Sequence, residues 1–127
     1  MTILWVALGS ALGGAGRYAV SGFMAHLVGE TFPWGTLTVN VAGSFLITLV
    51  AAMTGPDGRL FMSSDIRQFI MLGVLGGFTT FSSFGLQTLA LAQDGEWLRV
   101  SGNVVGSVVL CLAGAWAGHA LATLINR

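Results

Sequence analysis

Four long segments of the chain consist mainly of apolar and small residues, and short polar stretches separate them. Three of these segments contain no charged residue: 31–56, 68–93 and 100–126. The fourth covers residues 3–28 and holds a single charge, Arg17. About 20 apolar residues in a helix cross the roughly 30 Å hydrocarbon core of a bilayer. The pattern therefore predicts an all-α membrane protein, one domain over residues 1–127, with four transmembrane helices at about 3–28, 34–54, 66–92 and 98–125.

The connecting stretches have the composition of turns at a membrane surface. They read "GETFP", "GPDGR" and "QDGEW", and Ser63 or Ser64 is placed to cap the third helix. Trp5, Trp34 and Trp97 fall near predicted helix ends, as an interfacial aromatic belt requires. Trp116 falls in the middle of the fourth helix, and we expect it to pack within a helix face.

Composition supports the membrane assignment. Hydrophobic residues make up 54% of the chain and charged residues only 8%, against about a quarter in soluble domains. The net charge is zero, so no basic surface for nucleic acid is indicated. No Ser/His/Asp set, phosphate-binding loop or pair of acids occurs, and the two histidines have no partner at ligand spacing, which argues against an enzyme.

Glycines four residues apart recur along the chain, and they predict close helix packing. The pairs are Gly9 and Gly13, Gly73 and Gly77, Gly102 and Gly106, and Gly114 and Gly118. Four short helices bury little surface, so the size of the chain favours a homo-oligomer.

The distribution of arginines between the two sides gives only a weak bias for the orientation of the chain in the membrane. Arg59, Arg67 and Arg127 share one predicted side, and the other side has Arg99, with Arg17 if that side chain reaches outward. Positive residues normally mark the cytoplasmic side. So small a bias leaves a dimer of oppositely oriented copies as a hypothesis.

Uncharged polar residues enter the membrane on three of the helices. Asn40 and Ser44 lie four apart on the second helix, as do Asn103 and Ser107 on the fourth. The third helix carries "GGFTTFSSF" (76–84), where hydroxyls stand between phenylalanines. An amide in hydrocarbon is costly unless paired, so these groups either bond across helices or line a polar track. Phenylalanines three apart also fit an ordinary packing stripe.

Arg17 has two interpretations as the one charge within a span. It lies about 21 Å along the helix from Ile3, within partial reach of the surface. It either snorkels or tethers helices, or it forms a positive vestibule that draws anions.

Three motifs together resemble the small fluoride channels of bacteria, the CrcB or Fluc family. They are "GGAGRY" (13–18), "GTLTVNVAGSF" (35–45) and "GGFTTFSSF" (76–84), one in each of the first three helices. The resemblance covers nearly the whole chain. It implies passive, fluoride-selective export across the bacterial inner membrane, which lowers fluoride toxicity. It also implies a dual-topology homodimer with two pores at the subunit interface and a third helix broken near its middle.

The resemblance also implies roles for particular residues. A structural sodium ion, held and not transported, would be bound by the backbone carbonyls of Gly76 and Thr79. Arg17 matches the basic residue of the first motif. The residues that match the fluoride pore are Asn40, Thr80, Phe81, Ser82, Phe84 and Ser107.

The chain departs from the family pattern at three places. Gln87 stands where an acid is common, Phe78 stands where leucine is usual, and Cys111 leaves a thiol where a hydroxyl would extend the polar track.

The pore chemistry rests on replacing the water around fluoride. Amide and hydroxyl donors, with the electropositive edges of Phe81 and Phe84, would substitute for the hydration shell. The glycine pair Gly76 and Gly77 would permit the helix break.

Two other functional classes remain open at this point. A small proton-coupled multidrug exporter also has four spans, but it needs an acid buried in a span, and all five acidic residues fall in linkers or at helix edges. A non-conducting membrane subunit would need only the glycine pairs, and it leaves the polar residues unexplained.

Overall fold

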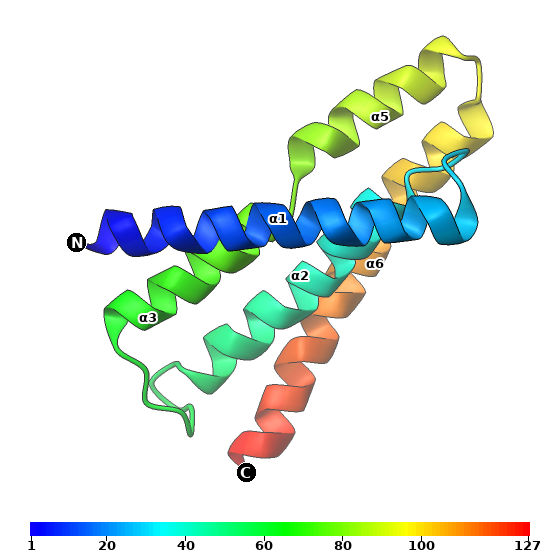
Figure 1. Cartoon of the computed structure of the whole chain (residues 1–127). Helices are drawn as coiled ribbons and strands as arrows, with labels where there is room; N and C mark the ends of the chain where they lie inside the picture. The colour runs from blue at the N-terminus through cyan, green and yellow to red at the C-terminus, as the bar shows by residue number, and fades with distance from the viewer.

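The computed structural model describes residues 1–127 and is entirely helical (Figure 1). α1 covers Thr2–Val28, α2 covers Trp34–Met53 and α6 covers Trp97–Asn126. The third span, Ser64–Gln93, consists of several shorter segments. All four spans are long and apolar enough to cross a membrane. The four predicted helices are therefore present, with ends within two residues of the expected positions.

The third span is irregular from Phe69 to Thr80. It begins as α3 (Ser64–Gln68), continues as a π-helix (Phe69–Leu75) and ends its first half as α4 (Gly76–Phe78). Thr79 and Thr80 are then extended, with φ and ψ of −86° and 159° and of −156° and 119°. The helix resumes as α5 (Phe81–Gln93), and Figure 1 shows the thin link below α5.

The break lies at Thr79 and Thr80, just after the glycine pair that was expected to permit it. Both glycines belong to the short helix α4. Their use is in packing: a Cβ on Gly77 would lie 2.9 Å from the Cα of Ser10 on α1. The two extended residues after them are threonines, whose β-branched side chains favour extended backbone.

Hydroxyl groups cap both halves of the third span. Ser63 Oγ accepts from the N–H of Ile66 at 3.4 Å and begins α3, as the sequence suggested. Thr80 Oγ1 accepts from the N–H of Ser83 at 3.2 Å and begins α5. Each cap satisfies one of the N–H groups that a helix start leaves free.

Glycines bring α1 against the first half of the third span. A Cβ at Gly9 would lie 2.6 Å from the Phe69 carbonyl oxygen and 2.8 Å from the Cα of Gly73. At Gly13 it would collide with the Val74 carbonyl oxygen. Backbones can approach this closely only where no side chain intervenes, which is how small residues associate helices in lipid.

A second glycine contact joins α2 to α6. A Cβ at Gly114 would lie 3.0 Å from the Val41 carbonyl oxygen, and one at Gly118 would meet the Phe45 carbonyl oxygen. Thr48 Oγ1 adds a hydrogen bond to the Ala115 carbonyl at 2.9 Å. The other predicted pair does not pack in this way within the chain: Gly102 approaches only the Phe32 ring, and Gly106 faces open space.

Both termini lie at the same end of the bundle as the loop between α2 and α3 (Figure 1). Thr2 Oγ1 donates to Asp65 Oδ1 at 2.9 Å, and the Arg59 N–H donates to Asn126 Oδ1 at 3.1 Å. The other two loops lie at the opposite end. This arrangement is the one that an even number of spans requires.

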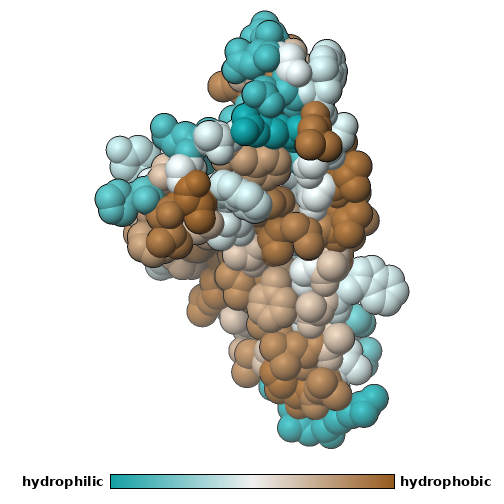
Figure 2. All heavy atoms as spheres, turned by 90° about the vertical axis from the view of Figure 1, so that its right-hand side faces the viewer, coloured by the Kyte–Doolittle hydropathy of each residue, from teal (hydrophilic) through white to brown (hydrophobic).

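Most of the surface is apolar, and only 13 of 127 residues are buried. Figure 2 shows hydrophilic residues at the top, at the bottom and on the upper left flank of one face, and mainly hydrophobic residues over the rest. Trp116 is 76% exposed, so the expectation that it packs within the chain is wrong. A tryptophan ring facing lipid loses no hydrophobic free energy, because the surrounding solvent is also apolar.

We expect Gly9→Val to destabilise the protein by about 1–3 kcal/mol, because backbone atoms surround the position and cannot move aside. Thermal unfolding of the purified protein in detergent measures the change. Gly22→Val on the same helix is the matched control, since nothing lies within 4 Å of its Cβ position. Equal melting temperatures for both variants would contradict this packing.

Candidate functional site

A cavity of about 440 Å³ opens beside the break in the third span. α2, α6 and both halves of the third span contribute to its wall. Phe81 lines it and is nevertheless 82% exposed, so the cavity reaches the surface of the single chain. The lining residues are Asn40, Gly43, Ser44, Ile47, Leu75, Thr79, Thr80, Phe81, Phe84, Ser107, Val108, Cys111 and Leu112.

Most of the residues assigned to a pore by resemblance meet at this cavity. Asn40, Thr80, Phe81, Phe84 and Ser107 line it. Ser82 does not line it: its hydroxyl lies 3.2 Å from that of Thr80 on the exposed side of α5. Of the two residues assigned to sodium, Thr79 lines the cavity and Gly76 lies outside it, exposed at the surface.

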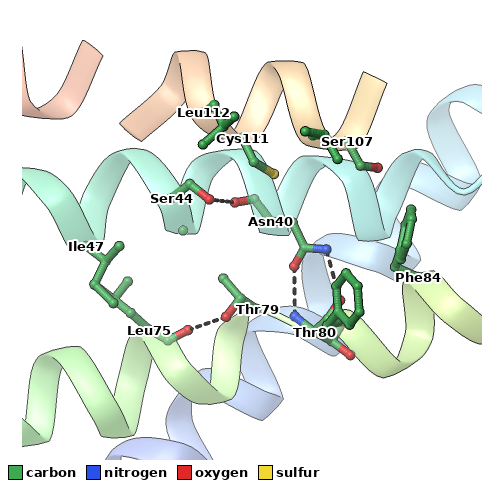
Figure 3. Close-up of a pocket in the computed structure, with 13 residues that line it drawn as sticks. Asn40, Ser44, Ile47, Leu75, Thr79, Thr80, Phe84, Ser107, Cys111 and Leu112 are labelled. Atoms are coloured by element: carbon green, nitrogen blue, oxygen red, sulfur yellow. Dashed lines mark hydrogen bonds between the residues drawn. The ribbon is translucent and has the colours of Figure 1, made fainter. Parts of the chain in front are cut away.

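Asn40 holds the extended backbone of the break (Figure 3). Its Oδ1 accepts from the Thr80 N–H at 2.8 Å, and its Nδ2 donates to the Thr80 carbonyl at 2.9 Å. The amide thus replaces both hydrogen bonds that a continuous helix would have given Thr80. The other N–H of the Asn40 amide has no hydrogen-bond partner in the chain.

Several hydroxyl protons near the cavity are already used by the backbone. Thr79 Oγ1 donates to the Leu75 carbonyl at 3.1 Å, and Ser44 Oγ donates to the Asn40 carbonyl at 2.7 Å (Figure 3). Each hydroxyl has one proton. The hydroxyls of Thr79 and Ser44 therefore have no proton left to donate to an ion.

Phe81 and Phe84 form a stacked pair with ring centroids 5.2 Å apart and an angle of 28° between the rings. Near-parallel rings present their rims side by side, and the rim is the electropositive part of an aromatic ring. Phe78 belongs elsewhere, because its ring fits between Gly16 of α1 and Gly43 of α2. The three phenylalanines are thus not one packing stripe within the chain.

Ser107 meets the cavity from α6 and is tied to a buried amide behind it. Its hydroxyl donates to Asn103 Oδ1 at 3.3 Å, and Asn103 Nδ2 donates to Thr88 Oγ1 at 2.9 Å. Asn103 is only 1% exposed. Thr88 did not stand out in the sequence, because a single threonine one turn after Phe84 gives no signal of its own.

The break leaves backbone carbonyls without an N–H partner. No hydrogen bond within the chain reaches the carbonyls of Gly76, Gly77 or Phe78. Arg17 Nη1 lies 3.5 Å from the carbonyl oxygen of Thr79, so this arginine points inward to the break. Free carbonyl oxygens are ligands that a hard cation accepts. The Gly76 carbonyl is free for such a cation, and the Thr79 carbonyl keeps one lone pair beside its contact with Arg17.

A second cavity, of about 320 Å³, lies at the end of the bundle where α1 meets α2. Its wall includes Ser21, Thr36, Gln87 and Asp94. Gln87 Oε1 is buried and has no hydrogen-bond partner in the chain. Gln87, the amide that stands where an acid is common in the family pattern, thus lies beside this second cavity and not beside the cavity at the break.

The model of the family described as CrcB-like protein, Camphor Resistance (CrcB), matches residues 4–119. This chain belongs to the CrcB family. A relative from Rhodospirillum rubrum is 58% identical over 100% of this chain and 98% of its own length. One from Paramagnetospirillum magneticum is 59% identical over 100% and 99%, and one from Opitutus terrae is 59% identical over 97% and 93%.

Each of these three CrcB relatives bears the name fluoride-specific ion channel FluC. An ion channel is not a class of enzyme. Four apolar spans and membership of the CrcB family together make this chain a multi-pass membrane protein.

We expect Asn40→Ala to lower the stability of the protein, because it orphans the N–H and the carbonyl of Thr80. Each orphaned group costs about 1–3 kcal/mol. Thermal unfolding in detergent measures the loss. Ser44→Ala is the control, since its hydroxyl bonds only its own helix. If Asn40→Ala melts at as high a temperature as this control, Asn40 does not bridge the break.

Proposed function

We propose that this protein is a fluoride-selective channel that lets fluoride leave the cytoplasm passively across the bacterial inner membrane and so confers fluoride resistance. The observation that carries the proposal is the mid-membrane cavity, where an amide donor and a stacked phenylalanine pair converge on a helix break. The names of the relatives support the same function.

The cavity offers fluoride a partial substitute for its water. Moving an unsolvated small anion into hydrocarbon costs of the order of tens of kcal/mol. The free N–H of Asn40 donates one hydrogen bond, and the rims of Phe81 and Phe84 add weak attraction without a full positive charge. A conducting site must bind well enough to admit an ion and weakly enough to release it.

A homodimer of antiparallel copies would complete the cavity, giving two pores along the subunit interface. The support is the exposed Phe81, the cavity that opens to the surface of one chain, and the small number of buried residues. The weak arginine asymmetry is compatible with insertion in both directions.

A structural sodium ion would lie at the break, held by the carbonyls of Gly76 and Thr79 from both copies. The support is that the Gly76 carbonyl has no partner in the chain and Thr79 has only the long contact to Arg17. When bound, the ion would supply positive charge that balances carbonyl dipoles inside the membrane. Arg17 is suited to tether α1 to the same carbonyl.

Passive export fits the distribution of charge better than proton-coupled drug export. All five acidic residues are exposed and none lies within the membrane part of a span: Glu30, Asp57, Asp65, Asp94 and Glu96. Fluoride accumulates in a cell when hydrofluoric acid enters and dissociates, so its own gradient drives it out. A non-conducting subunit would have no use for an amide donor and a stacked ring pair beside the break.

We expect Phe81→Ala to abolish or strongly reduce fluoride efflux from liposomes that contain the purified protein, because it removes half of the ring pair. A fluoride electrode records the efflux. The melting temperature should stay within a few degrees of wild type, since the ring is mostly exposed in the single chain. Phe23→Ala, an exposed ring on α1 outside the cavity, is the control.

Two results would count against this assignment. Wild-type efflux no faster than from empty liposomes rules out the channel, and full efflux through Phe81→Ala rules out the ring pair as part of the path.

We expect replacement of sodium by N-methylglucamine to weaken the dimer, because carbonyls from two copies would then face each other without a cation. Size-exclusion chromatography and thermal unfolding in detergent measure the effect, independently of flux. A dimer that is equally stable in both salts would contradict a sodium ion at this position.

A further inference from the structure

A chain of three side-chain hydrogen bonds runs from the backbone of α5 to the cavity. Thr88 Oγ1 donates to the Phe84 carbonyl at 2.6 Å. Asn103 Nδ2 donates to Thr88 Oγ1 at 2.9 Å, and Ser107 Oγ donates to Asn103 Oδ1 at 3.3 Å. Asn103 is almost fully buried, and Ser107 lines the cavity. We refer to Thr88, Asn103 and Ser107 as the relay.

The direction of every bond in the relay follows from its first member. A backbone carbonyl can only accept, so the single proton of Thr88 goes to Phe84. The oxygen of Thr88 then has only lone pairs left, and the group facing it must be the nitrogen of the Asn103 amide. The oxygen of that amide consequently faces Ser107, and Ser107 must donate to it.

We propose that Thr88 and Asn103 are positioning residues that turn the Ser107 proton away from the ion path, an inference that rests on the proposed function. With its proton given to Asn103, Ser107 has only lone pairs to offer the cavity. Fluoride is purely an acceptor and cannot bind to them. The ion gains the Ser107 hydrogen bond only by taking it from Asn103.

This competition tunes how tightly the cavity holds an anion. The bond from Ser107 to Asn103 is the longest of the three, so it is the link that an ion can break. A Ser107 proton that always pointed into the cavity would hold fluoride more firmly. The relay therefore favours release, which conduction requires.

Thr88→Val tests the relay with little change in shape. Without the Thr88 oxygen, the Asn103 amide is free to turn and donate to Ser107, whose proton then points into the cavity. We expect the fluoride concentration at half-maximal flux to fall roughly three- to tenfold, the range of one net hydrogen bond. Thr88→Ser keeps a hydroxyl and should restore the wild-type value.

The double variant Thr88→Val, Ser107→Ala separates the relay from general loosening. We expect it to have the same half-maximal concentration as Ser107→Ala alone, because the effect of Thr88 acts through the Ser107 proton. No shift in Thr88→Val, or a shift that persists without the Ser107 hydroxyl, overturns the inference.

A measurement without flux separates failure of the relay from failure of the proposed function. In protein labelled with ¹⁵N at asparagine, the side-chain amide proton shifts of Asn103 should move more in Thr88→Val than in Ser107→Ala, since the nitrogen faces Thr88. The opposite order overturns the relay, whether or not the protein conducts. Absence of flux in the wild type contradicts only the proposed function.

Discussion

A helix broken inside a bilayer must find partners for its freed backbone groups within the protein, because the hydrocarbon offers none. This constraint governs the site at Thr79 and Thr80. Asn40 takes both backbone groups of Thr80, and the Thr80 hydroxyl caps the helix that follows. Arg17 approaches the Thr79 carbonyl from α1. The same few contacts that make the break tolerable also put an amide, hydroxyls and aromatic rings around one cavity.

The glycine contacts lie away from the cavity and hold in place the helices that form it. Close approach of α1 to the π-helix, and of α2 to α6, fixes the helices that carry Arg17, Asn40 and Ser107. Hydrocarbon gives no hydrophobic driving force for helices to associate. Close van der Waals packing and interhelical hydrogen bonds must therefore hold the helices together. Polar side chains can then be held at defined positions without charged partners. An anion path needs this, because a strong charge would trap the ion.

The spans and the gathering of polar residues could be predicted from sequence because both depend on residue type and helical spacing. Asn40, Phe84 and Ser107 lie on regular helices, and the structure brings them together. The place of the break could not be predicted from the glycines, since Gly76 and Gly77 serve packing while two threonines are extended. The π-helix before it has no sequence signal. The direction of hydroxyl protons has no sequence signal either, because it depends on neighbours that only the fold supplies, as at Thr88 and Thr79. Trp116 was wrongly placed because apolar residues in lipid need no internal partner.

The backbone bridge at Asn40 leaves one amide N–H for a passing anion. A crystal structure of the protein in lipid, grown with fluoride, tests it most directly. We expect an ion in the cavity about 3 Å from Nδ2 of Asn40, the distance of an ordinary hydrogen bond, beside the rims of Phe81 and Phe84. A cavity closed by side chains of a second copy, with both amide protons of Asn40 bound to protein, would contradict it.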